Sequence, residues 1–143
     1  MTGKLAGRLS IFLLCGVVLG CGGADYNGEK RFPLTGKVTF DGQPIEWGSI
    51  AFIPQSGNNQ RVSGSVIQNG VYDVPEAKGA NAGKHRVEIH WLKPTGKKIQ
   101  PPDSEDIVDE RVEALPPKFH AQSELSAEIS GDNTRFDFDL KSN

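Results

Sequence analysis

Alternation of apolar and polar residues dominates the chain after Pro33. Leu34, Val38 and Phe40 alternate with polar neighbours, and the run 47–54 is rich in residues that favour β-structure. A period of two is typical of β-strands with one face buried. The same pattern predicts further strands at residues 62–67, 71–74, 84–92, 125–129 and 135–140. In the last of these, the row of Phe136, Phe138 and Leu140 is expected to face inward.

Turn signals separate these runs. Asp41-Gly42 and Asn69-Gly70 are dipeptides typical of two-residue hairpin turns. Seven short strands with turns between them, and no long helical pattern, predict an all-β chain that forms a single seven-stranded antiparallel β-sandwich of the Ig-like kind. We place this domain at residues 33–143.

One segment, residues 93–118, departs from the pattern. It holds five of the nine prolines and six acidic residues, which predicts a Pro-rich charged insertion in the sandwich. Connections of this length inside a compact domain are either functional or partly ordered. Val108, Val112 and Leu115 recur at helical spacing, so a short helix is expected over residues 106–114.

The N-terminus has the features of a targeting segment. Lys4 and Arg8 precede an apolar run of 11 residues, Leu9–Leu19. A membrane-spanning helix needs about 20 such residues, whereas a signal peptide needs fewer, so residues 1–20 are expected to be a signal peptide. The run ends in Val18-Leu19-Gly20-Cys21, which resembles the lipobox of bacterial lipoproteins. That resemblance implies lipidation of Cys21, and the alternative is an ordinary secretory signal with an incidental cysteine.

Lipidation would make the membrane a partner of the mature chain. Two or more acyl chains hold a protein firmly at a bilayer. Residues 21–32 then form the lipidated cysteine and a polar, glycine-rich tether. Gly22 stands where an aspartate usually signals inner-membrane retention, so the resemblance implies an outer-membrane location. With Cys15 removed and Cys21 lipidated, no disulfide is expected in the domain.

The charge of the mature chain excludes one class of partner. Loss of Lys4 and Arg8 leaves 14 basic residues against 18 acidic ones, a net charge of −4. A chain of this sign has no electrostatic attraction to nucleic acid or to an anionic bilayer face.

Several motifs resemble known β-sandwiches. The segments 36–45 (Gly-Lys-Val-Thr-Phe-Asp-Gly-Gln-Pro-Ile), 48–54, 69–72 and 83–87 look like parts of a carboxypeptidase-regulatory-like or transthyretin-like domain. Pro116-Pro117-Lys118-Phe119 and the final strand are similar to short lipoproteins of the planctomycete type. The resemblance implies a transthyretin-like sandwich without an established reaction. The related hydroxyisourate hydrolases would have a Tyr-Arg-Gly-Ser ending where this chain has residues 138–143, so hydrolysis is a remote alternative.

Neither a metal site nor a cofactor is expected. His85 and His90 project to opposite faces of one predicted strand, and His120 with either of them gives only two ligands. We therefore interpret all three as surface or edge histidines. The acidic residues of 93–118 lack the glycine and spacing of an EF-hand loop, which favours a solvated mixed-charge segment.

Two aromatic residues are candidates for ligand contact. Trp47 and Phe119 lie near predicted loops, where they could stack on sugars or on a peptide, with core or rim packing as the alternative. We expect a non-catalytic lipoprotein module that holds an envelope partner through residues 93–118. A carbohydrate- or small-ligand-binding module that uses Trp47 or Phe119 is the second possibility.

Replacement of the lipidated sulfur tests the anchor. We expect Cys21→Ser to yield a soluble, normally folded periplasmic protein, because no core contact is predicted to need that sulfur. Fractionation should move the variant from membrane to soluble material, with a thermal melt unchanged from that of the wild type. A variant that no longer folds would contradict the prediction.

Overall fold

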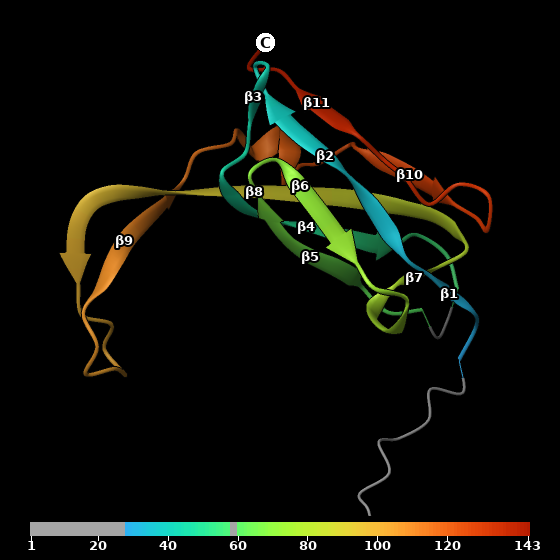
Figure 1. The fold of residues 1–143 in the computed structure, drawn as a ribbon, viewed down its shortest axis with the longest axis horizontal. Coiled ribbons are helices and arrows are strands. Elements are labelled where there is room, and N and C mark those ends of the chain that lie inside the picture. Colours follow the sequence, from blue (N-terminus) through green and yellow to red (C-terminus); the bar gives the residue numbers. More distant parts are fainter. Residues whose placement is uncertain (1–27, 58–59) are drawn as a thin grey trace, which may run out of the picture.

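The computed structural model describes residues 28–57 and 60–143, and these form an all-β sandwich with one projecting ribbon (Figure 1). The expected signal peptide, Cys21 and most of the expected tether lie outside the described residues. The strands are β1 (Arg31–Phe32), β2 (Leu34–Phe40), β3 (Gln43–Pro44), β4 (Trp47–Pro54), β5 (Ser63–Gln68), β6 (Val71–Val74), β7 (Ala80–Asn81), β8 (Gly83–Ile99), β9 (Val108–Glu113), β10 (Ser126–Ile129) and β11 (Phe138–Leu140). Two single-turn 3₁₀ helices are η1 (Glu76–Lys78) and η2 (Pro117–Phe119).

The seven strands predicted from the sequence form one hydrogen-bonded path. Its order is β10-β8-β4-β5-β6-β2-β11, which confirms the all-β sandwich. Four further strands raise the count: β3 pairs with β2, β9 pairs with β8, and β1 pairs with β7. The pair β1–β7 corrects the boundary of the tether, because Arg31 and Phe32 are held against Asn81 and Ala80.

One pairing differs from the antiparallel expectation. β11 runs parallel to β2, with Phe138 opposite Val38 and Leu140 opposite Phe40. The chain between β10 and β11 crosses from one end of the strand path to the other, so β11 enters beside β2 in the same direction. Alternation along a strand reports which face is buried and carries no information about the direction of its neighbour.

Both predicted hairpin signals form turns of the expected kind. Asp41 and Gly42 have φ values of 50° and 81°, and Asn69 and Gly70 have φ values of 50° and 75°. Two successive positive φ values match the twist of a tight β-hairpin, and Asp, Asn and Gly tolerate them best. These turns set the register of β2 with β3 and of β5 with β6.

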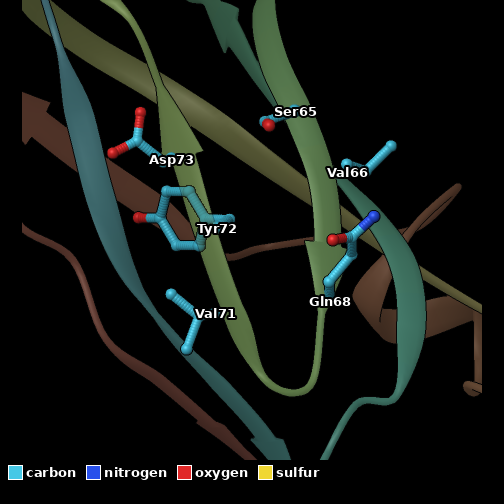
Figure 2. A pocket seen from close by; sticks show the side chains of 6 residues that line it. All are labelled: Ser65, Val66, Gln68, Val71, Tyr72 and Asp73. Carbon is cyan, nitrogen blue, oxygen red and sulfur yellow. The ribbon is translucent and has the colours of Figure 1, made fainter.

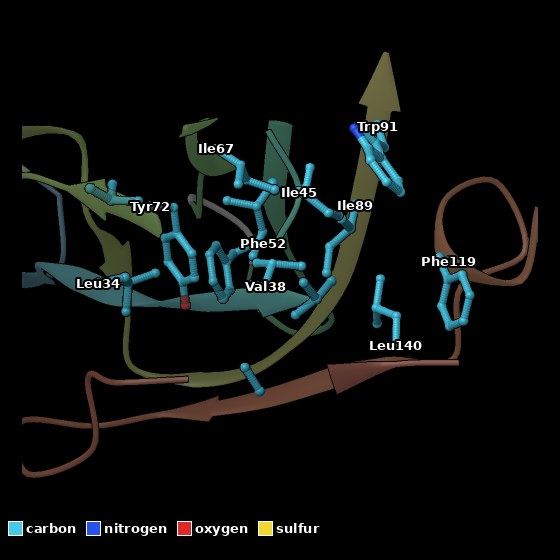
Figure 3. Packing of buried hydrophobic residues seen from close by; sticks show 14 of the residues in the cluster. Leu34, Val38, Ile45, Phe52, Ile67, Tyr72, Ile89, Trp91, Phe119 and Leu140 are labelled. Carbon is cyan, nitrogen blue, oxygen red and sulfur yellow. The ribbon is translucent and has the colours of Figure 1, made fainter. Parts of the chain in front are cut away.

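The core lies between the two layers of the folded sheet (Figure 3). Phe52 of β4 is fully buried and lies 5.9 Å, ring centre to ring centre, from Tyr72 of β6. Phe40 of β2 meets Trp91 of β8 edge to face at 6.0 Å. Of the predicted inward row in the last strand, Leu140 is buried, whereas Phe136 and Phe138 are only half-buried at the margin of the core.

The segment 93–118 is a β-ribbon and contains no α-helix. β8 continues to Ile99, and β9 returns antiparallel to it. The expected helix over residues 106–114 is therefore wrong. A spacing of four, as between Val108 and Val112, places two residues on one face of a helix and equally on one face of a strand. Pairing with β8 and the β-branched side chains of Val108 and Val112 favour a strand over a helix here.

We name residues 92–113 the arm, because in Figure 1 they project from one end of the sandwich with no other strand beside them. Within the described residues the structure has no helix with the length and apolar character needed to cross a membrane.

The phenol of Tyr72 ties β6 to the segment that leads into β11. Its hydroxyl donates to the Phe136 carbonyl at 2.8 Å, and burial raises the pKa of Tyr72, so the group stays protonated. The same carbonyl approaches Gly36 so closely that a Cβ there would lie 1.8 Å from its oxygen. Residue 36 therefore has to be glycine, although it stands in an apolar row.

Removal of this hydroxyl should weaken the domain. We expect Tyr72→Phe to lower the free energy of unfolding by about 1–2 kcal/mol, since the partly buried Phe136 carbonyl loses its donor. Urea unfolding followed by tryptophan fluorescence measures the change. The neighbouring Val71→Ala, at a half-exposed position, should change it by less than about 0.5 kcal/mol. Equal effects of the two substitutions would contradict the prediction.

Candidate functional site

The outer face of the sheet carries a row of exposed side chains across three strands. Trp47 of β4 lies opposite Gln68 of β5, which lies opposite Val71 of β6. Trp47 is 43% exposed, and Val71 and Val66 are each 50% exposed. Exposed apolar side chains that are contiguous mark contact surfaces more often than isolated ones do.

A shallow hollow lies at one end of this row, where β5 and β6 separate (Figure 2). The two strands pair only at Ile67–Tyr72 and Gln68–Val71, next to their turn. Beyond these pairs the strands diverge and leave a depression of about 300 Å³. Its lining residues are Ser65, Val66, Gln68, Val71, Tyr72 and Asp73.

Trp47 lies where the sandwich meets the arm. Arg111 of β9 places its guanidinium carbon 5.9 Å from the centre of the Trp47 ring, within the range of a cation–π contact. Arg111 also donates to the Leu92 carbonyl at 3.3 Å. The predicted candidate Trp47 is thus exposed and adjoins the arm.

Phe119, the other predicted aromatic candidate, lies in the core. Its side chain is only 7% exposed, and its ring meets Phe40 edge to face at 6.2 Å. Lys118 covers the ring from outside, with its ammonium 5.0 Å from the ring centre. The ring offers no free face for stacking, so of the two aromatic candidates we retain Trp47 alone.

The two faces of the arm differ in character. One face carries the ion pair Lys98–Asp109 at 2.7 Å, together with Arg111. The opposite face carries Ile99, Val108 and Val112, which are 42–50% exposed. Thr95 and Glu110 lie between them on the same face. Because Val112 lies opposite Lys93, this face continues the side of β8 that is buried as Val87, Ile89 and Trp91 inside the sandwich.

Glu113 fixes the base of the arm to the body. One carboxylate oxygen accepts the backbone N–H groups of Trp91 (3.0 Å) and Leu115 (2.9 Å). The other oxygen lies 2.7 Å from Nδ1 of His90. Burial opposes ionisation, but the two backbone donors and the imidazole outweigh it and hold the pKa of Glu113 below its usual range.

One of the three histidines is not placed as the sequence predicted. His85 is fully buried, which corrects its assignment as a surface or edge residue; its Nδ1 lies 3.0 Å from the Gly83 carbonyl. His90 is on the outer face, as expected, and stacks on His120 with ring centres 5.0 Å apart. Sequence reasoning missed Glu113 as the partner of His90, because 23 residues separate them and only the β8–β9 pairing brings them together.

The described residues offer no support for metal binding. Among residues 28–57 and 60–143, no group of three or more His, Cys, Asp or Glu side chains is arranged to hold a metal ion. The surface around Trp47, the hollow and the arm exposes apolar side chains, the guanidinium of Arg111 and the side-chain amide of Gln68. Such groups support stacking, hydrogen bonding and strand or side-chain contact with a partner.

We compared the chain with known proteins and found no relative. No family model, curated protein or solved structure matches the chain.

Loss of the Glu113 charge should loosen the base of the arm. At pH 7 we expect Glu113→Gln to lower the free energy of unfolding by roughly 1 kcal/mol, since the amide accepts the two backbone bonds more weakly. The stability that the carboxylate contributes is present above its unfolded-state pKa of about 4.3 and is lost as the pH falls through the lower pKa of the folded state. The difference between wild type and variant should therefore vanish in strong acid.

Urea unfolding at pH 7 and at acid pH measures this difference. Glu105→Gln, a matched change at an exposed position near the tip of the arm, should have no effect at either pH. A Glu113→Gln deficit that persists unchanged in acid would contradict the assignment.

Proposed function

We propose that the chain is a non-catalytic lipoprotein of the cell envelope whose sandwich holds a protein partner through the arm. The observation that carries the proposal is the uncovered apolar face of the arm, where Ile99, Val108 and Val112 are 42–50% exposed. A two-stranded ribbon is marginally stable by itself in water. A ribbon with such a face gains stability when a partner covers it.

The envelope location rests on the sequence. The apolar run 9–19 and the lipobox-like Val18-Leu19-Gly20-Cys21 support export and lipidation, and Gly22 supports an outer-membrane destination. The net charge of −4 after cleavage supports a protein partner in preference to nucleic acid.

A second candidate function is carbohydrate or small-ligand binding at Trp47. The observation in its favour is the row Trp47–Gln68–Val71 with its adjoining hollow. A flat aromatic ring beside amide and guanidinium donors suits a sugar ring. The row is open and shallow, so we rank it second.

Shortening of the arm tests the first proposal. Replacement of residues 94–111 by Asn-Gly joins Lys93 to Val112, which already lie opposite each other, through a tight turn. Glu113, Leu115 and Phe119 are retained, so the sandwich should keep its thermal stability. We expect this variant of the full-length chain to lose a protein that co-purifies with the wild type from envelope extracts.

The control is Val62→Ser, which removes an apolar side chain that is 61% exposed but lies outside the arm. It should retain the partner. If the shortened and full-length chains retain the same protein, the arm is not the contact surface. Binding of the wild type to a glycan panel that is lost in Trp47→Ala would favour the second candidate.

A further inference from the structure

β9 has a free edge. It pairs with β8 along one side, and no other strand of the described residues pairs with it. An unpaired strand edge presents a row of N–H and C=O groups that can accept another strand. β8 carries Pro94 and three lysines in the arm, which discourage pairing at its edge, whereas β9 has no proline.

The sequence of β9 is complementary to itself when it is reversed. The first five of its six residues read Val108-Asp109-Glu110-Arg111-Val112, with an apolar residue at each end and opposite charges on either side of Glu110. In an antiparallel pair, residues that lie opposite each other share a face and interact directly. A twofold axis through Glu110 would therefore place Asp109 opposite Arg111 of a second copy, and Val108 opposite Val112.

We propose that the arm pairs with the arm of a second copy, β9 against β9, in this register. The result is a four-stranded sheet in the order β8-β9-β9-β8 with two intermolecular Asp109–Arg111 pairs. The proposal rests on the proposed function and deepens it, because it names the partner of the arm. Such a contact is isologous and closes on itself.

Other registers are disfavoured by charge. A twofold axis at Arg111 would place this residue opposite itself and Asp109 opposite Glu113. A twofold axis at Asp109 would likewise place the two Asp109 carboxylates opposite each other. Like charges directly opposite each other destabilise a sheet.

The chosen register has one unfavourable pair, Glu110 opposite Glu110. In the single chain this carboxylate accepts a hydrogen bond from Thr95 of β8 on the same face.

The apolar face of the arm agrees with the same arrangement. Val108 lies opposite Ile99 in the arm, and Val112 shares their face. Pairing of two arms would place Ile99 and Val108 of one copy beside Val112 of the other, in a row across three strands. The twofold axis makes two such rows, one on each side of the Glu110 pair. Three or more strands with an apolar face are far more stable than a lone ribbon.

Disulfide trapping tests the register. In the full-length chain, Glu110→Cys should cross-link two copies on mild oxidation, since opposite residues of an antiparallel pair have the Cα separation that a disulfide requires. Val112→Cys is the matched control on the same face of β9; its own copy lies four positions away in the sheet, so it should cross-link at least about tenfold less. The wild type, with Cys15 and Cys21, gives the baseline.

Charge exchange tests the pairing energetically. Asp109→Arg and Arg111→Asp should each weaken self-association of the full-length chain in detergent by at least about tenfold, because each creates two like-charged pairs. The double variant re-forms both intermolecular pairs and should associate more tightly than either single variant, while the Lys98–Asp109 ion pair within each arm stays lost. Single variants that associate as the wild type does, or a double variant that stays as weak as the singles, would overturn the proposal.

The outcome separates the two proposals. If Glu110→Cys does not cross-link while the shortened arm still loses a different envelope protein, a second copy is not the partner, but the proposed function stands. If the shortened arm retains every partner, the proposed function fails.

Discussion

The long strand β8 is the element on which the rest of the structure depends. Over Gly83–Trp91 its inner face is covered by the opposite layer. One edge pairs with β4 from His85 to Trp91, and the other pairs with β10 from Gly83 to Arg86. Beyond Trp91 the same strand continues to Ile99, where β9 is the only strand of the described residues that pairs with it. Side chains alternate between the two faces along the whole strand. The face of β8 that is buried in the sandwich therefore continues into the arm, where it is exposed. The proposed contact residues Ile99, Val108 and Val112 thus continue the same alternation that builds the core.

Glu113 connects this uncovered extension to the rigid body. Its carboxylate binds the backbone at Trp91, the last covered residue of β8, and at Leu115, where the chain re-enters the core. Arg111 adds a contact with the Trp47 ring on the outer face. The arm is therefore fixed at its base, so it would lose less conformational entropy on binding a partner than a flexible loop would.

Most of the sandwich could be predicted, because its turn dipeptides and its alternation of apolar and polar residues each fit a single local structure. Asp41-Gly42 and Asn69-Gly70 require positive φ values, and alternation placed Val87, Ile89 and Leu140 inward. The arm could not be predicted, because the Val108–Val112 spacing fits helix and strand equally and only the distant β8 decides between them. Glu113 was missed for the same reason. Trp47 could be named from its residue type, but its contact with Arg111 depends on the arm.

The position of the arm relative to the start of the described chain bears on how a lipid-anchored module would work. β1 lies at the opposite end of the sandwich from the arm (Figure 1), and its pairing with β7 ties the chain to the body at that end. Ten residues from Cys21 to Lys30 span at most about 35 Å when fully extended. An anchor at Cys21 would hold the β1 end near the bilayer and leave the arm directed away from its own attachment point. Two copies on one membrane could then meet through their arms while their bodies stay apart, which is the arrangement that an antiparallel β9–β9 contact requires.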